Sequence, residues 1–418
     1  MLIAGFIFAG MRFHSYLNSA KKIIETYDGR EPLAAFLKKY FAANKKYGSR
    51  DRKQVAALCY NFYRLGKAMA DLPVEEMIIA GNFLCEYSSN EFLNFHKPEW
   101  NAVIEEPLSE KIRLTGIEIS ELFPWKNELS DGIDVLSFSS SFFIQPGLFL
   151  RIRPGKKTAL LKKMQDAGLA FEMRGDDCIA LPNTTKLDGI IEPDKDAVVQ
   201  DHNSQQVLNI LKDPTSRIPY PASGIQHPVS AWDCCAASGG KSLLAYDILN
   251  GQIALAVSDI RESILANLKK RFSAAGIKNY QSFIADLQTS NFKPQTSNLK
   301  LIQSVAEGQT SNFQLIICDA PCTGSGTWSR TPEQLYFFKE EMIGEYAALQ
   351  KQIVSNVIPH LQQNGMFIYI TCSVFKKENE EAVNFIKEKF HLRLLQMELL
   401  KGYDKKADSM FTASFIKE

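Results

Sequence analysis

From about Asp201 onward, short apolar segments alternate with longer segments of helical periodicity. The segments VSAWDCC, QIALAVS, SFIA, FQLIICD and GMFIYIT are rich in β-forming residues and almost continuously apolar, as in strands buried on both faces of a sheet. Most of them are separated by predicted helices at about residues 240–249, 262–275, 340–361 and 377–389. This alternation favours a doubly wound α/β domain over residues 201–418.

Two regions with different patterns of apolar residues precede this domain. Residues 1–125 carry apolar side chains at helical spacing and are predicted to form a helical domain, with one helix starting at Ser49. Residues 126–200 combine a β-rich run, an amphipathic helix ending at Gly168 and a hairpin turning at residues 175–177, which predicts a small α/β module.

A polar QTSN repeat occurs three times between residues 288 and 313. Because the copies are too short and too polar to bury a core, we interpret this segment as a surface insertion.

The composition is that of a folded, soluble protein, with 45% hydrophobic and 23% charged residues. No apolar run reaches the roughly 18 residues needed to span a bilayer. The apolar N-terminus is a poor secretory signal, and Met1 and Met11 are alternative translation starts. Eight cysteines without a regular framework indicate free thiols in a reducing cytoplasm. No His/Cys cluster has metal-ligand spacing, so we expect no metal, and we expect a monomer.

Charge is unevenly distributed, although the net charge is only +1. Residues 11–67 contain thirteen Lys/Arg against four Asp/Glu, a net of +9, whereas residues 68–130 have a net of −8. A basic element beside an acidic one fits a local phosphate-binding face, and tyrosines interleave with the basic residues. The alternative is that the paired lysines are the solvated side of helices. The predicted RNA contacts are Lys45, Lys46, Arg50 and Lys53, joined by Arg151 and Arg153, which alternate on one face of a predicted strand.

The segment WDCCAASGGKS, residues 232–242, follows a predicted strand and opens a predicted helix. Its small residues allow a ligand to approach backbone N–H groups closely. Gly240, Lys241 and Ser242 resemble the end of a nucleotide-binding P-loop, but Cys235 stands where that loop requires its first glycine. An NTPase is therefore disfavoured.

Acidic residues end the next two strands. Asp259 closes ALAVSD, about 20 residues after the glycine loop, where an acid accepts hydrogen bonds from ribose hydroxyls. Asp286 closes FIAD, and its carboxylate could accept from an adenine amino group. Together they suit a nucleoside-containing cofactor.

Two cysteines follow the fourth and fifth strands. LIICDAPCTGSGTW places Asp319 and Cys322 just beyond one strand, and FIYITCSV places Cys372 just beyond the other. Carbon 5 of cytosine is not nucleophilic until a nucleophile adds to carbon 6, so an enzyme acting there needs a thiolate. The alternative is that such cysteines are buried and inert. This fits Cys234 and Cys318, which lie within apolar strands, better than it fits Cys322 and Cys372, which lie in turns.

These segments resemble a known family. DCCAASGGKS, SDIRESIL, IADL, ICDAPCTGSGTWSRTPE and YITCSV are similar to successive motifs of the Sun/RsmB family of RNA 5-methylcytosine methyltransferases. VVQDHNSQQV, LFLRIRPGKKT and DSMFTASFIK also match, so the resemblance covers roughly Phe142 to the end. Two departures are Ser238, where the family usually has proline, and the QTSN insertion.

The resemblance implies a Rossmann-like domain that uses S-adenosylmethionine, preceded by a small α/β (RRM-like) module. It implies that Cys372 is the nucleophile, that Cys322 assists product release and that Asp319 binds the edge of a flipped cytosine. Spacing alone leaves open which cysteine attacks. The implied cofactor contacts are Cys235, Ala236, Ala237, Ser238, Gly239, Gly240, Lys241, Asp259, Asp286 and Asp319.

The helical region is similar to the NusB-like domain of the ribosomal RNA members, which favours 16S ribosomal RNA as substrate. A transfer RNA cytosine-5 methyltransferase and an inactive RNA-binding ribosome assembly factor are the alternatives.

Overall fold

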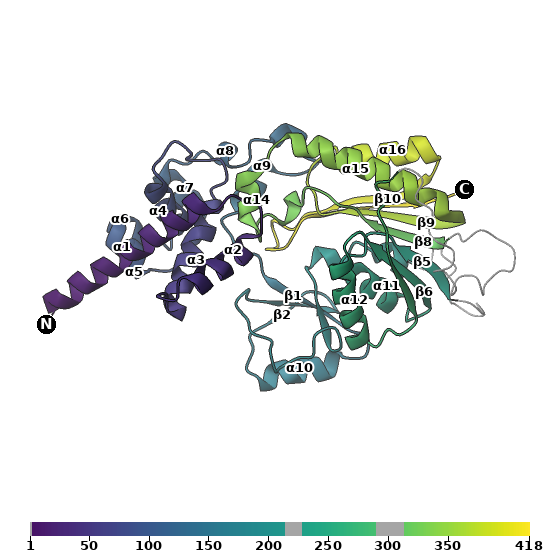
Figure 1. The fold of residues 1–418 in the computed structure, drawn as a ribbon, viewed down its shortest axis with the longest axis horizontal. Helices are drawn as coiled ribbons and strands as arrows, with labels where there is room; N and C mark the ends of the chain where they lie inside the picture. Colours follow the sequence, from purple (N-terminus) through teal and green to yellow (C-terminus); the bar gives the residue numbers. More distant parts are fainter. Residues whose placement is uncertain (1, 214–227, 290–312) are drawn as a thin grey trace. The chain divides into compact units, whose positions relative to one another are not determined.

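The computed structural model describes residues 2–213, 228–289 and 313–418 (Figure 1). The chain divides into two compact units. The helical unit comprises residues 1–127, 133–145 and 327–340, and the sheet unit comprises residues 128–132, 146–326 and 341–418. The domain boundaries near residues 125 and 200 stay predictions.

The helical unit contains helices whose lengths range from 4 to 25 residues. Ser49 is the first residue of α3, as predicted, and the Asp51 carboxylate accepts a hydrogen bond from the Gly48 N–H at 3.0 Å. That contact satisfies one of the free N–H groups at the start of the helix. The helices are α1 (Leu2–Thr26), α2 (Leu33–Ala43), α3 (Ser49–Tyr63), α4 (Val74–Cys85), α5 (Glu91–His96), α6 (Pro98–Asn101), α7 (Leu108–Thr115), α8 (Ile119–Leu122), α9 (Val135–Ser141) and α14 (Pro332–Phe337).

The sheet unit begins with a small antiparallel sheet of strand order β2-β3-β1-β4. Its elements are β1 (Leu148–Ile152), α10 (Lys157–Asp166), β2 (Glu172–Met173), β3 (Cys178–Leu181) and β4 (Ala197–Val199). The predicted strand, helix and hairpin are confirmed, and β4 is an additional strand. Leu160 and Met164 of α10 pack on Leu150 and Ile179 of the sheet.

The main sheet has seven strands in the order β10-β11-β9-β8-β5-β6-β7. Neighbours from β9 through β7 pair in parallel, while β11 is antiparallel to both β9 and β10. Its elements are β5 (Val229–Asp233), α11 (Gly240–Ile248), β6 (Ile253–Asp259), α12 (Glu262–Ala274), β7 (Tyr280–Ile284), β8 (Phe313–Asp319), α15 (Glu341–Val357), β9 (Leu361–Thr371), α16 (Glu380–Phe390), β10 (Arg393–Leu400) and β11 (Met410–Ile416).

Helices cover both faces of this sheet, with α11 and α12 on one face and α15 and α16 on the other (Figure 1). Adjacent residues of a strand face opposite layers, so Ala231 packs with α11 and α12 while Trp232 packs with α15. The predicted doubly wound α/β class is therefore confirmed. Strand order reverses between β5 and β8, and a crevice is expected at the carboxyl ends of strands at such a point.

Two features fall outside the sequence-based description. Strands β10 and β11 were not anticipated, although every residue of β11 is buried. The QTSN segment lies mostly outside the described residues. Among the helices that are described, none is both long enough and apolar enough to cross a membrane.

Candidate active site

A cavity of about 620 Å³ lies at the carboxyl ends of β5, β6, β7, β8 and β9. Its lining brings together the glycine loop, the strand-end acids and both turn cysteines that the sequence singled out. The lining residues among these are Cys235, Ala237, Asp259, Asp286, Asp319, Cys322 and Cys372.

The glycine loop joins β5 to α11 through two left-handed residues. Ala237 has φ 46° and Gly239 has φ 85°. A Cβ on Gly239 would lie 2.7 Å from the ring of Phe272, so both conformation and space require glycine there. The Ala237 N–H donates to the Asp259 carboxylate at 3.0 Å, which ties the loop to the end of β6.

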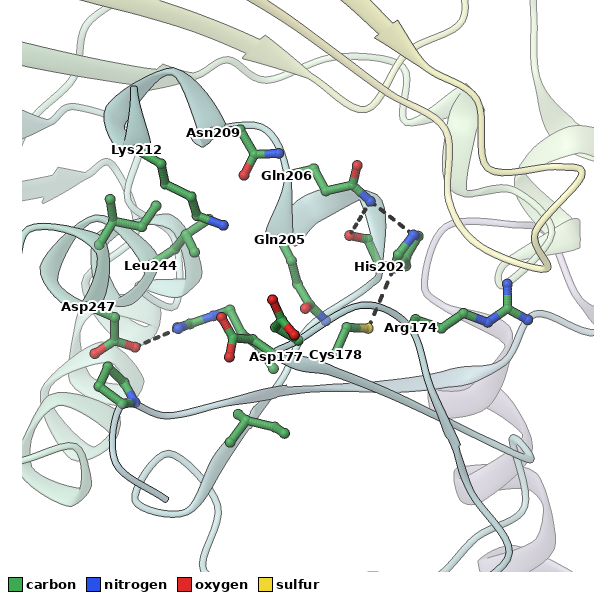
Figure 2. A pocket seen from close by; sticks show the side chains of 15 residues that line it. Arg174, Asp177, Cys178, His202, Gln205, Gln206, Asn209, Lys212, Leu244 and Asp247 are labelled. Carbon is green, nitrogen blue, oxygen red and sulfur yellow. Dashed lines mark hydrogen bonds and ion pairs between the residues drawn. The ribbon is translucent and has the colours of Figure 1, made fainter. Parts of the chain in front are cut away.

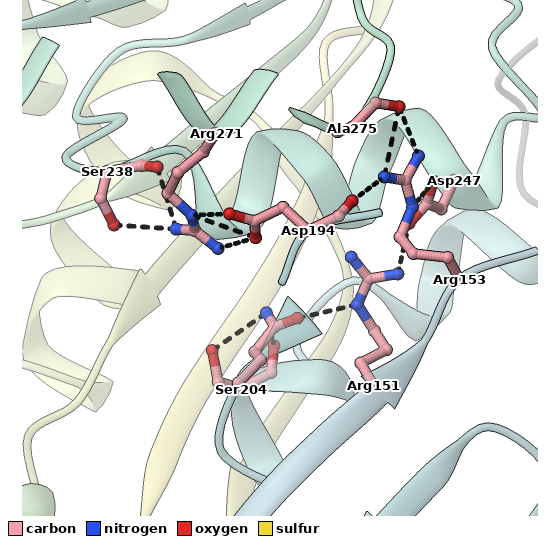
Figure 3. A network of polar contacts seen from close by, with 9 residues as sticks. Arg151, Arg153, Asp194, Ser204, Ser238, Asp247, Arg271 and Ala275 are labelled. Atoms are coloured by element: carbon pink, nitrogen blue, oxygen red, sulfur yellow. Dashed lines mark hydrogen bonds and ion pairs between the residues drawn. The ribbon is translucent and has the colours of Figure 1, made fainter. Parts of the chain in front are cut away.

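Ser238, the position where the family usually has proline, is held by a distant arginine (Figure 3). Arg271 Nη1 donates to the carbonyl oxygen and to the hydroxyl of Ser238, both at 3.0 Å. The same guanidinium pairs with the Asp194 carboxylate at 2.8 Å. These contacts restrain the loop from outside, where proline would restrain it through its own φ angle.

The two strand-end acids differ in the hydrogen-bonding capacity that they keep for a ligand. Besides Ala237, Asp259 accepts hydrogen bonds from the N–H and the side chain of Arg261, at 2.9 and 3.0 Å. Asp286 Oδ1 accepts from the Gln288 N–H at 2.9 Å. A carboxylate offers about four acceptor positions. A further contact with Arg261 Nη2 at 3.3 Å fills those of Asp259, whereas Asp286 can accept further hydrogen bonds.

Lys241 extends from α11 toward β8 and forms an ion pair with Asp319 at 2.7 Å between Nζ and Oδ2. Burial lowers the pKa of Lys241, but its attraction to Asp319 and their hydrogen bond outweigh that effect, and its pKa is raised above the ordinary value. The cation therefore keeps the Asp319 carboxylate paired. Sequence reasoning assigned Lys241 to the cofactor and missed this pair, which joins residues 78 positions apart.

The two turn cysteines meet. Cys322 Sγ and Cys372 Sγ lie 3.3 Å apart, and both side chains are partly buried. The hydrogen bond with Cys372, followed by burial, raises the pKa of Cys322 well above that of an ordinary thiol. Either sulfur atom can be the donor of this hydrogen bond, and the direction of the pKa shift favours the Cys322 S–H.

A buried carboxylate, Glu378, connects the two cysteine turns. It accepts hydrogen bonds from the Thr323 N–H at 2.9 Å, the Thr323 hydroxyl at 2.6 Å and the Ser373 hydroxyl at 2.6 Å. Gln350 Nε2 adds another at 3.0 Å. Burial raises the pKa of Glu378, against the lowering effect of these donors. Sequence reasoning missed Glu378, because KKENEE at the start of α16 has the composition of an exposed helix end.

Arg151 and Arg153, predicted to grip RNA phosphates, are 5% and 9% exposed. Arg151 Nη1 and Arg153 Nε lie 2.5 and 3.0 Å from the Asp247 carboxylate (Figure 3). This placement corrects the expectation, because the strand face on which they alternate packs toward α11 and a protein carboxylate takes the place of a phosphate. Arg151 also lines a second cavity, of about 600 Å³, with His202 and Lys212 (Figure 2).

The four basic residues predicted in the helical unit are exposed. Lys45 and Lys46 precede α3, and Arg50 and Lys53 lie in its first turns. Arg50 forms a long ion pair with Glu91, with 3.8 Å between Nη2 and Oε2. Their exposure leaves them accessible, and RNA contact there stays a prediction.

Residues 226–415 match the model of a family described as 16S rRNA methyltransferase RsmB/F. Ribosomal RNA small subunit methyltransferase B of Serratia proteamaculans is 28% identical over 260 residues, which cover 60% of this chain and 54% of the relative. Methyltransferase F of Vibrio vulnificus is 24% identical over 204 residues, covering 48% and 40%. The chain thus spans about half the length of the curated relatives it matches.

Solved structures support the fold. The crystal structure of PH0851 has a TM-score of 0.64 at 15% identity and covers 98% of each chain. A methyltransferase homolog protein from Pyrococcus horikoshii has a TM-score of 0.54 at 18% identity, covering 70% of this chain and 92% of that one. The motifs that assemble around one cavity thus lie in residues that match the RsmB/F family model, which confirms the resemblance of this part of the chain to the Sun/RsmB family.

Proposed function

We propose that this chain transfers a methyl group from S-adenosylmethionine to carbon 5 of a cytosine in RNA. One observation carries the proposal: Cys322 and Cys372 reach from the turns after neighbouring strands to within 3.3 Å of each other. They do so in the cavity that also contains the glycine loop and the strand-end acids. Because the curated relatives are named as ribosomal RNA methyltransferases, ribosomal RNA of the small subunit is the proposed substrate.

The residues present fit the cofactor. The cavity of about 620 Å³ lies within the range of about 300–1,000 Å³ typical of small-molecule sites. Asp286 can accept a hydrogen bond from an amino group, and Asp259 can accept from ribose hydroxyls once the exposed Arg261 side chain turns away from it. When bound, the cofactor supplies an electrophilic methyl group. Removing Asp259 should weaken cofactor binding by about 1.5–3 kcal/mol for each lost hydrogen bond, which calorimetry on Asp259→Ala can measure.

The chain's side chains supply the remaining chemistry. Cys372 Sγ forms a bond to carbon 6 of the flipped cytosine, which makes carbon 5 nucleophilic. Asp319, paired with Lys241, binds the edge of the base by accepting a hydrogen bond from its amino group. After carbon 5 has gained the methyl group, a base removes its proton and the bond between Cys372 and carbon 6 breaks. Cys322, kept as a neutral thiol, assists that release.

Denaturing gels with substrate RNA test this assignment. Cys372→Ala should form no covalent adduct and transfer no methyl group, whereas Cys322→Ala should accumulate RNA attached through Cys372. Cys59→Ala, which removes a buried thiol in the helical unit, is the matched control and should behave as the unmodified protein. An adduct with Cys372→Ala and none with Cys322→Ala would exchange the two roles. If the unmodified protein forms no adduct and transfers no methyl group, the alternative function of an inactive RNA-binding assembly factor would be favoured.

The exposed basic residues of the helical unit are proposed to contact RNA phosphates. Reversing the charges of Lys45, Lys46, Arg50 and Lys53 should reduce the slope of log K against log salt by up to about 0.7–0.9 for each lost contact. An unchanged slope would show that they are only a solvated surface. Bisulfite sequencing of RNA from a deletion strain would distinguish ribosomal from transfer RNA.

A further inference from the structure

Three cysteines outside the proposed catalytic pair converge beneath the glycine loop. Cys234 and Cys235 directly follow β5, and Cys318 is the penultimate residue of β8, the neighbouring strand. Their sulfur atoms all lie within 4.8 Å of one another, and those of Cys234 and Cys235 are 4.0 Å apart. In the part of the chain that the structure describes, this is the one group of three potential metal ligands so arranged.

The backbone fixes this arrangement. The Cys234 N–H donates to the carbonyl oxygen of Ile317 at 3.0 Å, and Asp233 is in register with Ile317. The register between β5 and β8 therefore sets the distance between Cys234 and Cys318. Both side chains are buried among the apolar residues that pack under α15 and α16.

The distances suit a thiolate-bound ion. With zinc–sulfur bonds of about 2.3 Å, sulfur atoms around one ion are about 3.8–4.0 Å apart. The Sγ atoms of Cys234 and Cys235 are already at this distance. Because no two of the three sulfur atoms are more than 4.8 Å apart, each remaining sulfur–sulfur distance has to shorten by no more than about 1 Å. Cys235 also lines the cavity of about 620 Å³, which provides access and an open fourth position for water.

We propose that Cys234, Cys235 and Cys318 form a binding site for a soft divalent cation, with Zn²⁺ as its ion. Thiolates select soft ions over magnesium and calcium. Three thiolates around a divalent ion carry a net charge of −1, whereas around a monovalent ion such as Cu⁺ they carry −2. Because a buried unpaired charge is costly, the divalent ion is favoured. Binding deprotonates the thiols and releases their protons, so affinity should fall as the pH is lowered.

The test uses the full chain, reduced and stripped of metal. The background carries Cys322→Ser and Cys372→Ser, because that close thiol pair could itself bind a soft ion. Zn²⁺ binding is measured by competition with a chromophoric chelator, and Cd²⁺ binding by the thiolate-to-metal absorption band in the ultraviolet. The background protein should bind one equivalent of each ion.

Single variants Cys234→Ala, Cys235→Ala and Cys318→Ala should each lose the absorption band. Losing even an indirect partner of a metal ligand costs about 10–100-fold in affinity, so losing a ligand should cost at least about 100-fold. Cys59→Ala removes an isolated buried cysteine and should bind as the background does. A folded background that binds no Zn²⁺, or variants with unchanged affinity, would overturn the proposal.

A second measurement needs no substitution in the cluster and remains informative if a variant does not fold. In the background protein with Cys322→Ser and Cys372→Ser, Zn²⁺ should slow alkylation of the half-buried Cys235, quantified by mass spectrometry of the peptide that contains it. Alkylation of Cys235 at the same rate with and without saturating Zn²⁺ would contradict the site.

Discussion

Replacing Glu378 should separate the two cysteine turns without removing either thiol. Glu378→Ala deletes a carboxylate that accepts from the residues directly after both cysteines, Thr323 and Ser373. The hydroxyls of these two residues are 3.2 Å apart and can pair with each other instead. The Thr323 N–H and Gln350 Nε2 lose an acceptor in a buried site.

The expected loss of stability follows from these contacts. Each buried donor left without its acceptor costs about 1–3 kcal/mol, and a truncated buried side chain adds about 1 kcal/mol for the space it leaves. With two such donors, we expect the free energy of unfolding of Glu378→Ala to fall by about 3–7 kcal/mol, measured by urea denaturation. Glu381→Ala, a substitution of an exposed neighbour on α16, should stay within about 0.5 kcal/mol.

Activity should fall because the thiols lose their relative position. A misplacement of about 1 Å at a reacting group costs on the order of 100-fold in rate, so adduct formation in a single turnover should slow by about that factor. Cofactor affinity should change little, since Glu378 does not line the cavity.

Glu378→Gln distinguishes a positioning role from a chemical one. Its amide oxygen can accept from the Thr323 N–H and Gln350, while the hydroxyls of Thr323 and Ser373 can rotate to accept from its NH₂ group. Most of the adduct rate should therefore return. A stable Glu378→Gln protein as slow as Glu378→Ala would refute positioning and indicate that the carboxyl group handles a proton.

Three further predictions concern the loop, a buried acid and the neutral thiol. Arg271→Ala should weaken cofactor binding by up to about 30-fold in calorimetry, because two hydrogen bonds of about 1 kcal/mol each are lost, and adding Ser238→Pro should restore most of the affinity. No recovery would show that Arg271 does not act through the loop. Burial raises the pKa of Asp233 from 3.8 to about 7, so the folded state binds the extra proton, and about 4 kcal/mol of stability is lost as the pH rises from about 4 to 7. Asp233→Asn should remove that slope in urea melts at several pH values, and a persistent slope would assign it to another group. Cys322 should be alkylated more slowly than an ordinary thiol at pH 8, and faster once Cys372→Ala removes the main cause of its raised pKa; an unchanged rate would contradict the hydrogen bond.

Local sequence was sufficient to predict the elements that carry the site. Strands buried on both faces read as continuous apolar runs, and helices α11 and α12 begin at the predicted residues. Residues just beyond parallel strands must meet at one edge, so Asp259, Asp319 and Cys372 could be placed together without any distance information.

Side chains with distant partners could not be predicted in this way. Arg151 and Arg153 alternate on one strand face as expected, but their partner Asp247 lies more than 90 residues away and converts a candidate phosphate site into a buried ion pair. Strand β11 enters the sheet between β9 and β10, a pairing that alternation of strands and helices does not predict.

The substitution of serine for proline in the glycine loop shows how a long-range contact can replace a local restraint. Proline limits the loop through its own backbone, independent of any other residue. Ser238 instead depends on Arg271 of α12, and Arg271 depends on Asp194, which lies three residues before the start of β4 of the small sheet. The conformation of the cofactor loop is thereby linked to the small sheet, since a displacement of Asp194 would release the arginine that holds Ser238. A ligand that changes the environment of Asp194 should alter cofactor affinity in this protein, and a chain with proline at position 238 should not show that dependence.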